Sequence, residues 1–203
     1  MIIIVDYGMG NLGSVLNMFK KVGAQSKISS DLNEISKAEK ILLPGVGSFD
    51  TAMQRITDAG MKDILTNKAM VEKIPVLGIC LGMQLLTDGS EEGELNGLGW
   101  IKGKAYHFHD RIEENLRVPH MGWNVATIQN ESALTKNSEG ELRFYFVHSY
   151  YVLADNPSHS MMKTNYGITF DSALFQDNIF GAQFHPEKSH KFGMNLFSNF
   201  AKI

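Results

Sequence analysis

The chain has 203 residues, 43% of them hydrophobic, and a formal net charge of -3 at pH 7. This length and hydrophobic content predict one compact domain over residues 1–203. This charge gives neither the basic surface of a nucleic-acid-binding protein nor a polybasic patch for a membrane. No apolar run approaches the ~20 residues of a membrane span, and residues 1–6 lack the basic start of a signal peptide. The single cysteine cannot form an internal disulfide, which predicts a reducing, cytoplasmic setting.

The first half of the sequence alternates strand-like and helical stretches. Residues 2–5 are a continuous β-branched run, typical of a strand buried on both faces of a parallel sheet. After them the sequence predicts, in order, a turn (6–11), a helix (11–21), a strand (25–29), a helix (31–39), a strand (40–43), a loop (44–49) and helices around 50–59 and 61–71. This alternation predicts an α/β fold with an open, mostly parallel sheet flanked by helices.

The second half has a different character. Residues 88–96 are acidic and contain glycine, which predicts a surface loop. Short strand-like stretches follow, and we expect them to add antiparallel or mixed strands to the sheet: 104–108, 123–128, 143–147, 150–153, 161–164 and 179–184. An amphipathic helix is predicted at 189–203, with an apolar side formed by Phe192, Leu196, Phe197 and Phe200.

Residues 74–86, IPVLGICLGMQLL, combine a strand-like run with a following helical stretch. Between the two, Gly78 and Gly82 flank Cys80 in the small-x-nucleophile-x-small arrangement that hydrolases place on a tight strand-to-helix turn. A Cβ at either glycine would collide with the neighbouring strand or helix. The helix start would direct backbone N–H groups at the sulfur, which favours a thiolate. Considered alone, Cys80 is also explained as a small buried hydrophobe.

A base for this cysteine is available in residues 180–189, FGAQFHPEKS. Pro186 restricts His185 to an extended conformation, so His185 and Glu187 can point to the same side. Cysteine chemistry needs a thiolate, an imidazole that transfers a proton and a carboxylate that fixes the imidazole tautomer. Each residue also has a structural explanation, His185 as a bonded histidine at a strand end and Glu187 as a charge near a helix start.

The loop after the third predicted strand offers donors for an oxyanion. Gly45 and Gly47 let backbone N–H groups face a ligand, and the N–H of Leu81 could supply a second donor. The alternative is an ordinary turn rich in turn-forming residues.

Two further patterns suggest other chemistry. Gly8, Gly10 and Gly13 match G-x-G-x-x-G between a predicted strand and helix, with Asp31 at the end of the next strand. This is the context of a dinucleotide-binding fingerprint, although the glycines can equally allow a tight turn and Asp31 can cap a helix. His107 and His109 share a strand face, but without a third ligand in register we predict no metal.

Three of these stretches together resemble the class I (triad-type) glutamine amidotransferases: GICLGMQ at 78–84, PGVG at 44–47 and HPEKS at 185–189. Three others are similar to the glutaminase subunits of imidazole glycerol phosphate synthases: DYGMGN at 6–11, PHMGWN at 119–124 and FYFVHSY at 144–150. The resemblance covers nearly the whole chain and is weakest at 88–96 and 129–142.

The resemblance implies a glutaminase that releases ammonia from L-glutamine without a cofactor. Cys80 would attack the side-chain amide, His185 would protonate the departing ammonia and activate water, and Glu187 would orient His185. The resemblance also implies a heterodimer with a (β/α)8-barrel synthase subunit. That partner would use the ammonia to make imidazole glycerol phosphate and an aminoimidazole carboxamide ribotide in histidine biosynthesis.

The same resemblance implies further residue roles. Gln84 and the backbone of Ser149 and Tyr150 would hold the glutamyl end of the substrate. The oxyanion loop would consist of Gly45, Val46 and Gly47. The partner interface and its mouth would be lined by Asn11, Pro119, His120, Met121, Gly122, Trp123, Asn124, Tyr145, His148 and Lys188.

Three other functions compete with this one. A paralogous glutaminase could supply ammonia to a sugar-modifying enzyme of surface-polysaccharide biosynthesis, with every catalytic motif shared. A catalytically silent regulatory subunit is a second alternative, against which the complete set of Cys80, His185 and Glu187 argues. The third is the dinucleotide-binding oxidoreductase.

Overall fold

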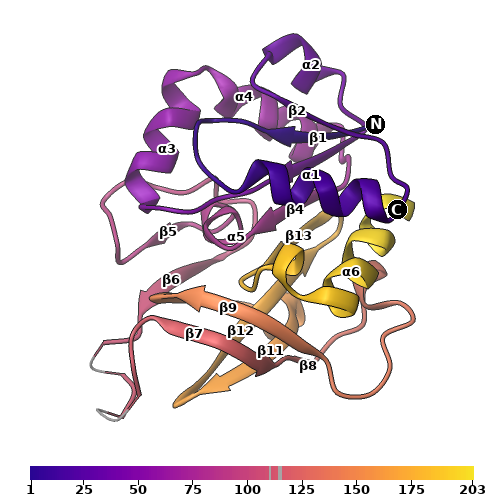
Figure 1. The fold of residues 1–203 in the computed structure, drawn as a ribbon. Coiled ribbons are helices and arrows are strands. Elements are labelled where there is room, and N and C mark those ends of the chain that lie inside the picture. The colour runs from indigo at the N-terminus through magenta and orange to yellow at the C-terminus, as the bar shows by residue number, and fades with distance from the viewer. Residues whose placement is uncertain (110, 114–115) are drawn as a thin grey trace.

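The computed structural model describes residues 1–109, 111–113 and 116–203 (Figure 1). Its centre is a parallel sheet with the strand order β2-β1-β3-β4-β13. The strands are β1 (Ile2–Val5), β2 (Ser26–Ser29), β3 (Lys40–Leu43), β4 (Val76–Ile79) and β13 (Ile179–Ala182). All residues of β1, β4 and β13 are buried, as expected of strands covered on both faces.

Helices cover both faces of this sheet (Figure 1). Successive residues of β1 face opposite layers: Ile2 and Ile4 pack in one apolar cluster, and Ile3 and Val5 in the other. The first cluster includes α1 (Leu12–Lys21) and α6 (His190–Lys202), whose rings Phe19 and Phe197 lie 4.8 Å apart. The second cluster includes α2 (Leu32–Ser36), α3 (Phe49–Asp58), α4 (Met61–Thr66) and α5 (Leu81–Leu85).

The sheet continues beyond β13 in the order β12-β10-β6-β5. These strands are β12 (Ile168–Gln176), β10 (Tyr150–Ala154), β6 (Gly103–His107) and β5 (Gly89–Ser90), antiparallel except for the β5–β6 pair. On the far side of β12, β11 (Ser160–Tyr166) pairs with β12 and with β8 (Thr127–Ile128). A separate two-stranded sheet is formed by β7 (His120–Val125) and β9 (Arg143–His148). The predicted fold class, a mostly parallel α/β sheet with added antiparallel strands, is confirmed.

Several predicted boundaries were wrong. β12 was not predicted, because Asp171 and Ser172 interrupt its apolar pattern. Asp171 is nevertheless buried, where it accepts hydrogen bonds from Ser160 Oγ, Lys163 Nζ and the backbone of Ala154. A buried aspartate whose hydrogen bonds come from neighbouring strands therefore helped to conceal a paired strand.

The other corrections are smaller. The predicted surface loop 88–96 contains β5 and is held by Asp50, which accepts from the N–H groups of Glu94 and Leu95. The helix predicted at 31–39 is only α2, and the one predicted at 61–71 is α4 followed by a π-helix, η1 (Asn67–Val71). In place of the single strand predicted at 123–128 there are two strands, β7 and β8, and β7 begins earlier, at His120. Short 3-10 turns lie at η2 (Ala133–Thr135), η3 (Pro157–His159) and η4 (Pro186–Lys188). Within the described residues, no helix has both the length and the apolar content that crossing a bilayer requires.

Candidate active site

Cys80 stands between β4 and α5 on a strained turn. Its backbone has φ 53° and ψ -111°, a conformation that residues with a side chain seldom adopt. Such a conformation costs on the order of 1–3 kcal/mol and persists only when the surroundings enforce it. The enforcing contact comes from β13: the N–H of Cys80 donates to the carbonyl of Ala182 at 2.7 Å. The predicted strand-to-helix turn is confirmed, and the thiol borders a cavity.

The two glycines around Cys80 permit this turn for a steric reason. A Cβ at Gly78 would lie 2.5 Å from the carbonyl oxygen of Gly82 in α5. A Cβ at Gly82 would lie 1.9 Å from the carbonyl oxygen of Leu43 in β3. Both obstacles are backbone atoms of packed elements, which cannot rotate away as a side chain could. The predicted collisions with the strand and the helix are therefore both present.

His185 and Glu187 form a buried pair just beyond β13. Nδ1 of His185 and Oε1 of Glu187 are 2.8 Å apart, and their side chains are 3% and 2% exposed. Because a carboxylate accepts hydrogen bonds, Nδ1 carries the proton of the imidazole in this pair. His185 has the extended backbone that Pro186 predicted, and its N–H donates to the carbonyl of Tyr145. Among the described residues, Nε2 of His185 has no hydrogen-bond partner and so can exchange a proton with a reacting group.

The electrostatic setting favours a charged His185. Burial opposes the charged ring, but the interactions with the Cys80 side chain and with the Glu187 carboxylate outweigh it and raise the pKa of His185 to about 10. An imidazolium beside a thiol is the arrangement that supports a thiolate nucleophile. The three predicted catalytic side chains are thus brought together by the pairing of β4 with β13.

A cavity of about 330 Å³ opens over Cys80 and His185. Most of the predicted substrate residues line it, namely Val46, Gly47, Leu81, Gln84, Ser149 and Tyr150. It is also lined by Pro119, Val147 and His148, and by Glu92. Residues from six separate stretches of the sequence therefore meet at the carboxyl ends of the parallel strands, where α/β sheets hold their ligands.

The predicted oxyanion donors face this cavity from two sides. Leu81 is the first residue of α5, so its N–H has no acceptor within the helix. Val46 and Gly47 are exposed on the opposite side, whereas Gly45 is buried against Leu81. The loop is anchored by Tyr7, whose buried hydroxyl donates to the carbonyl of Pro44. Tyr7 was not singled out from the sequence.

Two amides connect the cavity wall to the nucleophile. Nε2 of Gln84 donates to the carbonyl of Tyr150 at 3.4 Å and to Oε1 of Gln183 at 3.1 Å. Nε2 of Gln183 in turn lies 3.8 Å from Sγ of Cys80. Gln84 was predicted to act here; Gln183, which is fully buried, was not. Its place directly before the Phe-His-Pro-Glu run was the available signal.

Glu92 is a third residue of the site that was not predicted from the sequence. It belongs to the stretch that was predicted as a surface loop, yet its carboxylate lines the cavity and accepts from the N–H of Phe49 at 2.9 Å. Burial raises the pKa of Glu92, and the nearby Asp50 adds to this effect. Glu92 therefore brings an acidic residue to the wall of the cavity.

Several of the predicted partner-facing residues are exposed. Met121 and Trp123 of β7 are 62% and 41% exposed. The Trp123 ring lies 6.3 Å from that of Tyr145 and is stacked at 5.5 Å on His190, a residue that was not predicted. The ammonium of Lys188 lies 5.6 Å from the centre of the Tyr145 ring. Asn11 and Pro119 are also exposed, and Gly122 is partly exposed.

Two residues predicted for that surface are interior instead. His120 is 3% and His148 is 5% exposed, and their rings contact each other at 5.0 Å. Asn124 also turns inward and bonds His120. The reason is strand alternation: with Met121 and Trp123 outward, His120 and Asn124 point to the opposite face. His148 still borders the cavity, but His120 does not reach the partner-facing surface.

The dinucleotide interpretation finds no support in the geometry. Asp31 caps α2, where its carboxylate accepts from the N–H of Glu34 at 2.9 Å. Gly8 lies under Arg55, whose guanidinium donates to the Gly8 carbonyl. His107 Nδ1 accepts from the N–H of His109, and within the described ranges no group of three or more His, Cys, Asp or Glu residues is placed to hold a metal ion.

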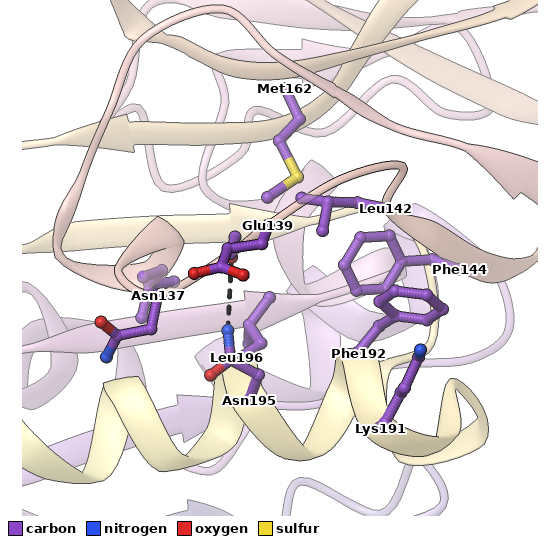
Figure 2. Close-up of a pocket in the computed structure, with 11 residues that line it drawn as sticks. Asn137, Glu139, Leu142, Phe144, Met162, Lys191, Phe192, Asn195 and Leu196 are labelled. Atoms are coloured by element: carbon purple, nitrogen blue, oxygen red, sulfur yellow. Dashed lines mark hydrogen bonds between the residues drawn. The ribbon is translucent and has the colours of Figure 1, made fainter.

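A second cavity, of about 300 Å³, lies against α6 and away from Cys80 (Figure 2). Its walls are largely apolar, with Leu142, Phe144, Met162, Phe192 and Leu196, and polar groups stand at Asn137, Glu139, Lys191 and Asn195. Asn195 donates to Ser138 Oγ at 3.2 Å. None of the lining residues that the structure describes is a cysteine or histidine, so the cavity over Cys80 is the candidate active site.

The sequence is similar to known proteins over its whole length. A sequence model of the family "Glutamine amidotransferase class-I" matches residues 3–203. The chain is 52% identical over 202 residues to "Imidazole glycerol phosphate synthase subunit HisH 2" of Methanococcus maripaludis, covering 100% of this chain and 99% of that protein. It is 49% identical over 203 residues to the subunit of the same name from Pseudomonas aeruginosa, with 100% of both covered.

Solved structures share the fold at lower sequence identity. "Crystal structure of glutamine amidotransferase" matches with a TM-score of 0.75 and 14% identity over 100% of both chains. "Structure of PurLQS from Thermotoga maritima" matches with a TM-score of 0.74 and 16% identity, covering 99% of this chain and 97% of that one. These two matches show a shared fold, that is, the arrangement of strands and helices, and nothing more.

The two interior histidines, His120 and His148, should make the free energy of unfolding depend on pH. Burial lowers the pKa of His120 to about 4; burial and the neighbouring His120 lower the pKa of His148 to about 3. In the unfolded chain both titrate near ~6.5, so the unfolded state binds more protons between ~6.5 and the folded values. The free energy of unfolding should therefore fall as the pH drops through this window, by up to ~1.4 kcal/mol per pH unit for each histidine.

Urea unfolding between neutral pH and pH ~4.5 measures this dependence. In His120→Phe the free energy of unfolding should depend less steeply on pH, by an amount that corresponds to about one bound proton. Phe170→Leu, which changes a fully buried ring in the same cluster, should keep the wild-type slope. Equal slopes in the wild type and His120→Phe would contradict the expectation.

Proposed function

The chain belongs to the class I glutamine amidotransferase family, and we propose that it is the glutaminase subunit of an imidazole glycerol phosphate synthase. The observation that carries the proposal is the meeting of Cys80, on its strained turn, with the buried His185–Glu187 pair in one cavity. The full-length similarity to subunits of that name supports the choice within the family. We further propose that residues 1–203 act as one glutamine amidotransferase domain.

In the proposed mechanism Cys80 attacks the side-chain amide carbon of L-glutamine as a thiolate. The negative charge that develops on the amide oxygen would be received by the N–H of Leu81 and by N–H groups of the loop at Val46 and Gly47. The raised pKa of His185 keeps a proton on the ring, which Nε2 can transfer to the departing nitrogen, so that ammonia and a thioester result.

The second half of the reaction restores the enzyme. His185, now neutral, would take a proton from water as the water attacks the thioester carbon, and glutamate would leave as the thiolate re-forms. The Glu187 carboxylate would hold Nδ1 of His185 protonated throughout, which leaves Nε2 as the atom that exchanges protons. No cofactor takes part in this scheme.

The cavity fits an α-amino acid with an amide side chain. The Glu92 carboxylate is placed to pair with the α-ammonium group. Gln84 and the backbone of Ser149 and Tyr150 would hold the rest of the glutamyl group.

The proposed partner is a (β/α)8-barrel synthase subunit that receives the ammonia, rather than nucleic acid or a membrane. The exposed apolar side chains of Met121 and Trp123 are typical of a protein interface. Tyr145 and Lys188 lie between these residues and the end of β13, where released ammonia could pass to the partner. The proposed nucleophile must remain a free thiol, which favours a reducing, cytoplasmic compartment.

A second candidate keeps the chemistry and changes the pathway. Both relatives reported above carry the number 2 in their names, which separates them from relatives named simply HisH, such as that of Bdellovibrio bacteriovorus at 45% identity. A glutaminase that feeds a sugar-modifying enzyme of surface-polysaccharide biosynthesis is therefore the alternative.

Growth of a histidine auxotroph that lacks this subunit decides between the two pathways. We expect the gene for this chain to restore growth without histidine when the cognate barrel subunit is co-expressed. The Cys80→Ala version serves as the inactive control. Failure to rescue while glutamine hydrolysis is retained in vitro would favour the surface-polysaccharide role.

Cys80→Ala should lower the rate of glutamine hydrolysis by at least about three orders of magnitude, because no other thiol is present to replace the nucleophile. Binding to the synthase subunit should persist, since the substitution lies inside the cavity. Glutamate release by the complex and co-elution of the two subunits measure these effects. Ser26→Ala, an equally small change at the far edge of the sheet, is the matched control. Wild-type turnover in Cys80→Ala would remove this residue from the mechanism.

We expect the isolated chain to hydrolyse glutamine at least about tenfold more slowly than the complex, because the family resemblance implies activation across the interface. Steady-state assays with increasing amounts of the synthase subunit measure the activation. Full turnover by the chain alone would contradict it.

A further inference from the structure

A pair of interior histidines, unused in the proposed chemistry, connects the cavity to the partner-facing strand. His120 begins β7 and His148 ends β9, and the two are directly paired in register. Nδ1 of His120 and Nε2 of His148 are 3.0 Å apart, and Nδ1 of His148 lies 2.7 Å from the carbonyl oxygen of Tyr150. At the other end, Nε2 of His120 lies 3.2 Å from Nδ2 of Asn124.

One arrangement of protons satisfies this chain of hydrogen bonds. The carbonyl of Tyr150 can only accept, so Nδ1 of His148 carries a proton and its Nε2 is an acceptor when the ring is neutral. His120 must then donate from Nδ1, which leaves its Nε2 to accept from the amide of Asn124. The second amide proton of Asn124 goes to the carbonyl of Asn165. The three bonds from Asn124 to His120, from His120 to His148 and from His148 to the Tyr150 carbonyl therefore all have their donor on the side of Asn124.

The chain continues from Tyr150 to the nucleophile. The same Tyr150 carbonyl accepts from Gln84, which also donates to Gln183, and Gln183 donates toward the sulfur of Cys80. A displacement of the Tyr150 carbonyl would therefore reach both the substrate-binding backbone and the environment of the thiol. Low local polarity strengthens such a network and makes an unpaired member costly.

The outer end of the chain lies directly behind the exposed side chains of β7. On β7, Met121 and Trp123 face outward while His120 and Asn124 face inward, so pressure on the outer side chains moves the inner ones with the strand. The His120 ring is held between Phe146 at 4.7 Å and Tyr166 at 4.1 Å, both nearly parallel to it. This stacking leaves the ring little freedom to absorb a displacement.

We propose that Asn124, His120 and His148 are positioning residues that transmit the docking of a partner protein on the outer face of β7 to the Tyr150 carbonyl and thereby set glutamine binding. The inference rests on the proposed function, because it presupposes a glutaminase with a partner at β7. The histidines hold a backbone group in place through directed hydrogen bonds, and they neither touch the reacting atoms nor exchange protons with them.

Imidazole tautomers in the wild-type protein test the relay without any substitution. Long-range proton–nitrogen NMR spectra at neutral pH should show both rings neutral with the proton on Nδ1. When the synthase subunit is added, the Nδ1–H signal of His148 should shift, and it should no longer shift in His120→Leu. A proton on Nε2 of either neutral ring, or an equal shift in His120→Leu, overturns the proposal.

Kinetics of the complex test what the relay does. His120→Leu should raise KM for glutamine about tenfold, which corresponds to ~1.4 kcal/mol, with a smaller change in kcat. His120→Asn retains a donor toward His148 and should bring KM back to within about threefold of the wild type. Phe170→Leu is the packing control, and its KM should match that of the wild type.

The outcomes separate the relay from the proposed function. If the wild-type complex hydrolyses glutamine and His120→Leu behaves like Phe170→Leu, the relay is wrong and the glutaminase assignment stands. If the wild-type complex does not hydrolyse glutamine, the proposed function fails, and with it the role of the relay in glutamine binding. In that case the tautomers and the response of His148 to the partner still decide whether the connection exists.

Discussion

The parallel pairing of β4 with β13 is the constraint on which the site depends. It aligns Ile79 with Ala182, so the two chains leave the sheet side by side and the N–H of Cys80 reaches the Ala182 carbonyl. This hydrogen bond helps to hold Cys80 at positive φ against a local strain of ~1–3 kcal/mol. A thiol and an imidazole that are far apart in the sequence thus meet because two buried strands are neighbours.

Burial of the His185–Glu187 pair is both a cost and a source of specificity. Removing two charges from water costs several kcal/mol for each ion unless hydrogen bonds and the opposite charge compensate. The bond between Nδ1 and Oε1 supplies part of this compensation, and the raised pKa of His185 shows that the attraction prevails over burial. Within the described residues, Nε2 of His185 and Oε2 of Glu187 have no hydrogen-bond partner. A ring nitrogen must be without a fixed hydrogen-bond partner if it is to donate and accept protons during a reaction, and Nε2 of His185 meets this requirement next to the thiol.

The sequence was sufficient where chemistry depends on local pattern and insufficient where it depends on distant contacts. The glycines around Cys80 and the proline after His185 constrain their own backbone, so the turn and the extended histidine were both predictable. Glu92 was not, because its acidic neighbours are typical of a solvated loop, and its approach to the cavity depends on Phe49 of α3. β12 was missed for a related reason, since the partners that satisfy Asp171 come from other strands.

His120 shows the same limit of prediction from sequence, because it was expected at the surface and is interior. The interface role predicted for residues 119–124 was extended to each of them, but a strand presents alternate residues to opposite faces. The part of the motif that faces inward has a different function from the part that faces outward. Because β7 carries exposed apolar side chains on one face and a hydrogen-bonded histidine on the other, the proposed contact with a partner would be linked to the cavity wall through one strand. A surface residue and a buried residue can therefore serve the same interface.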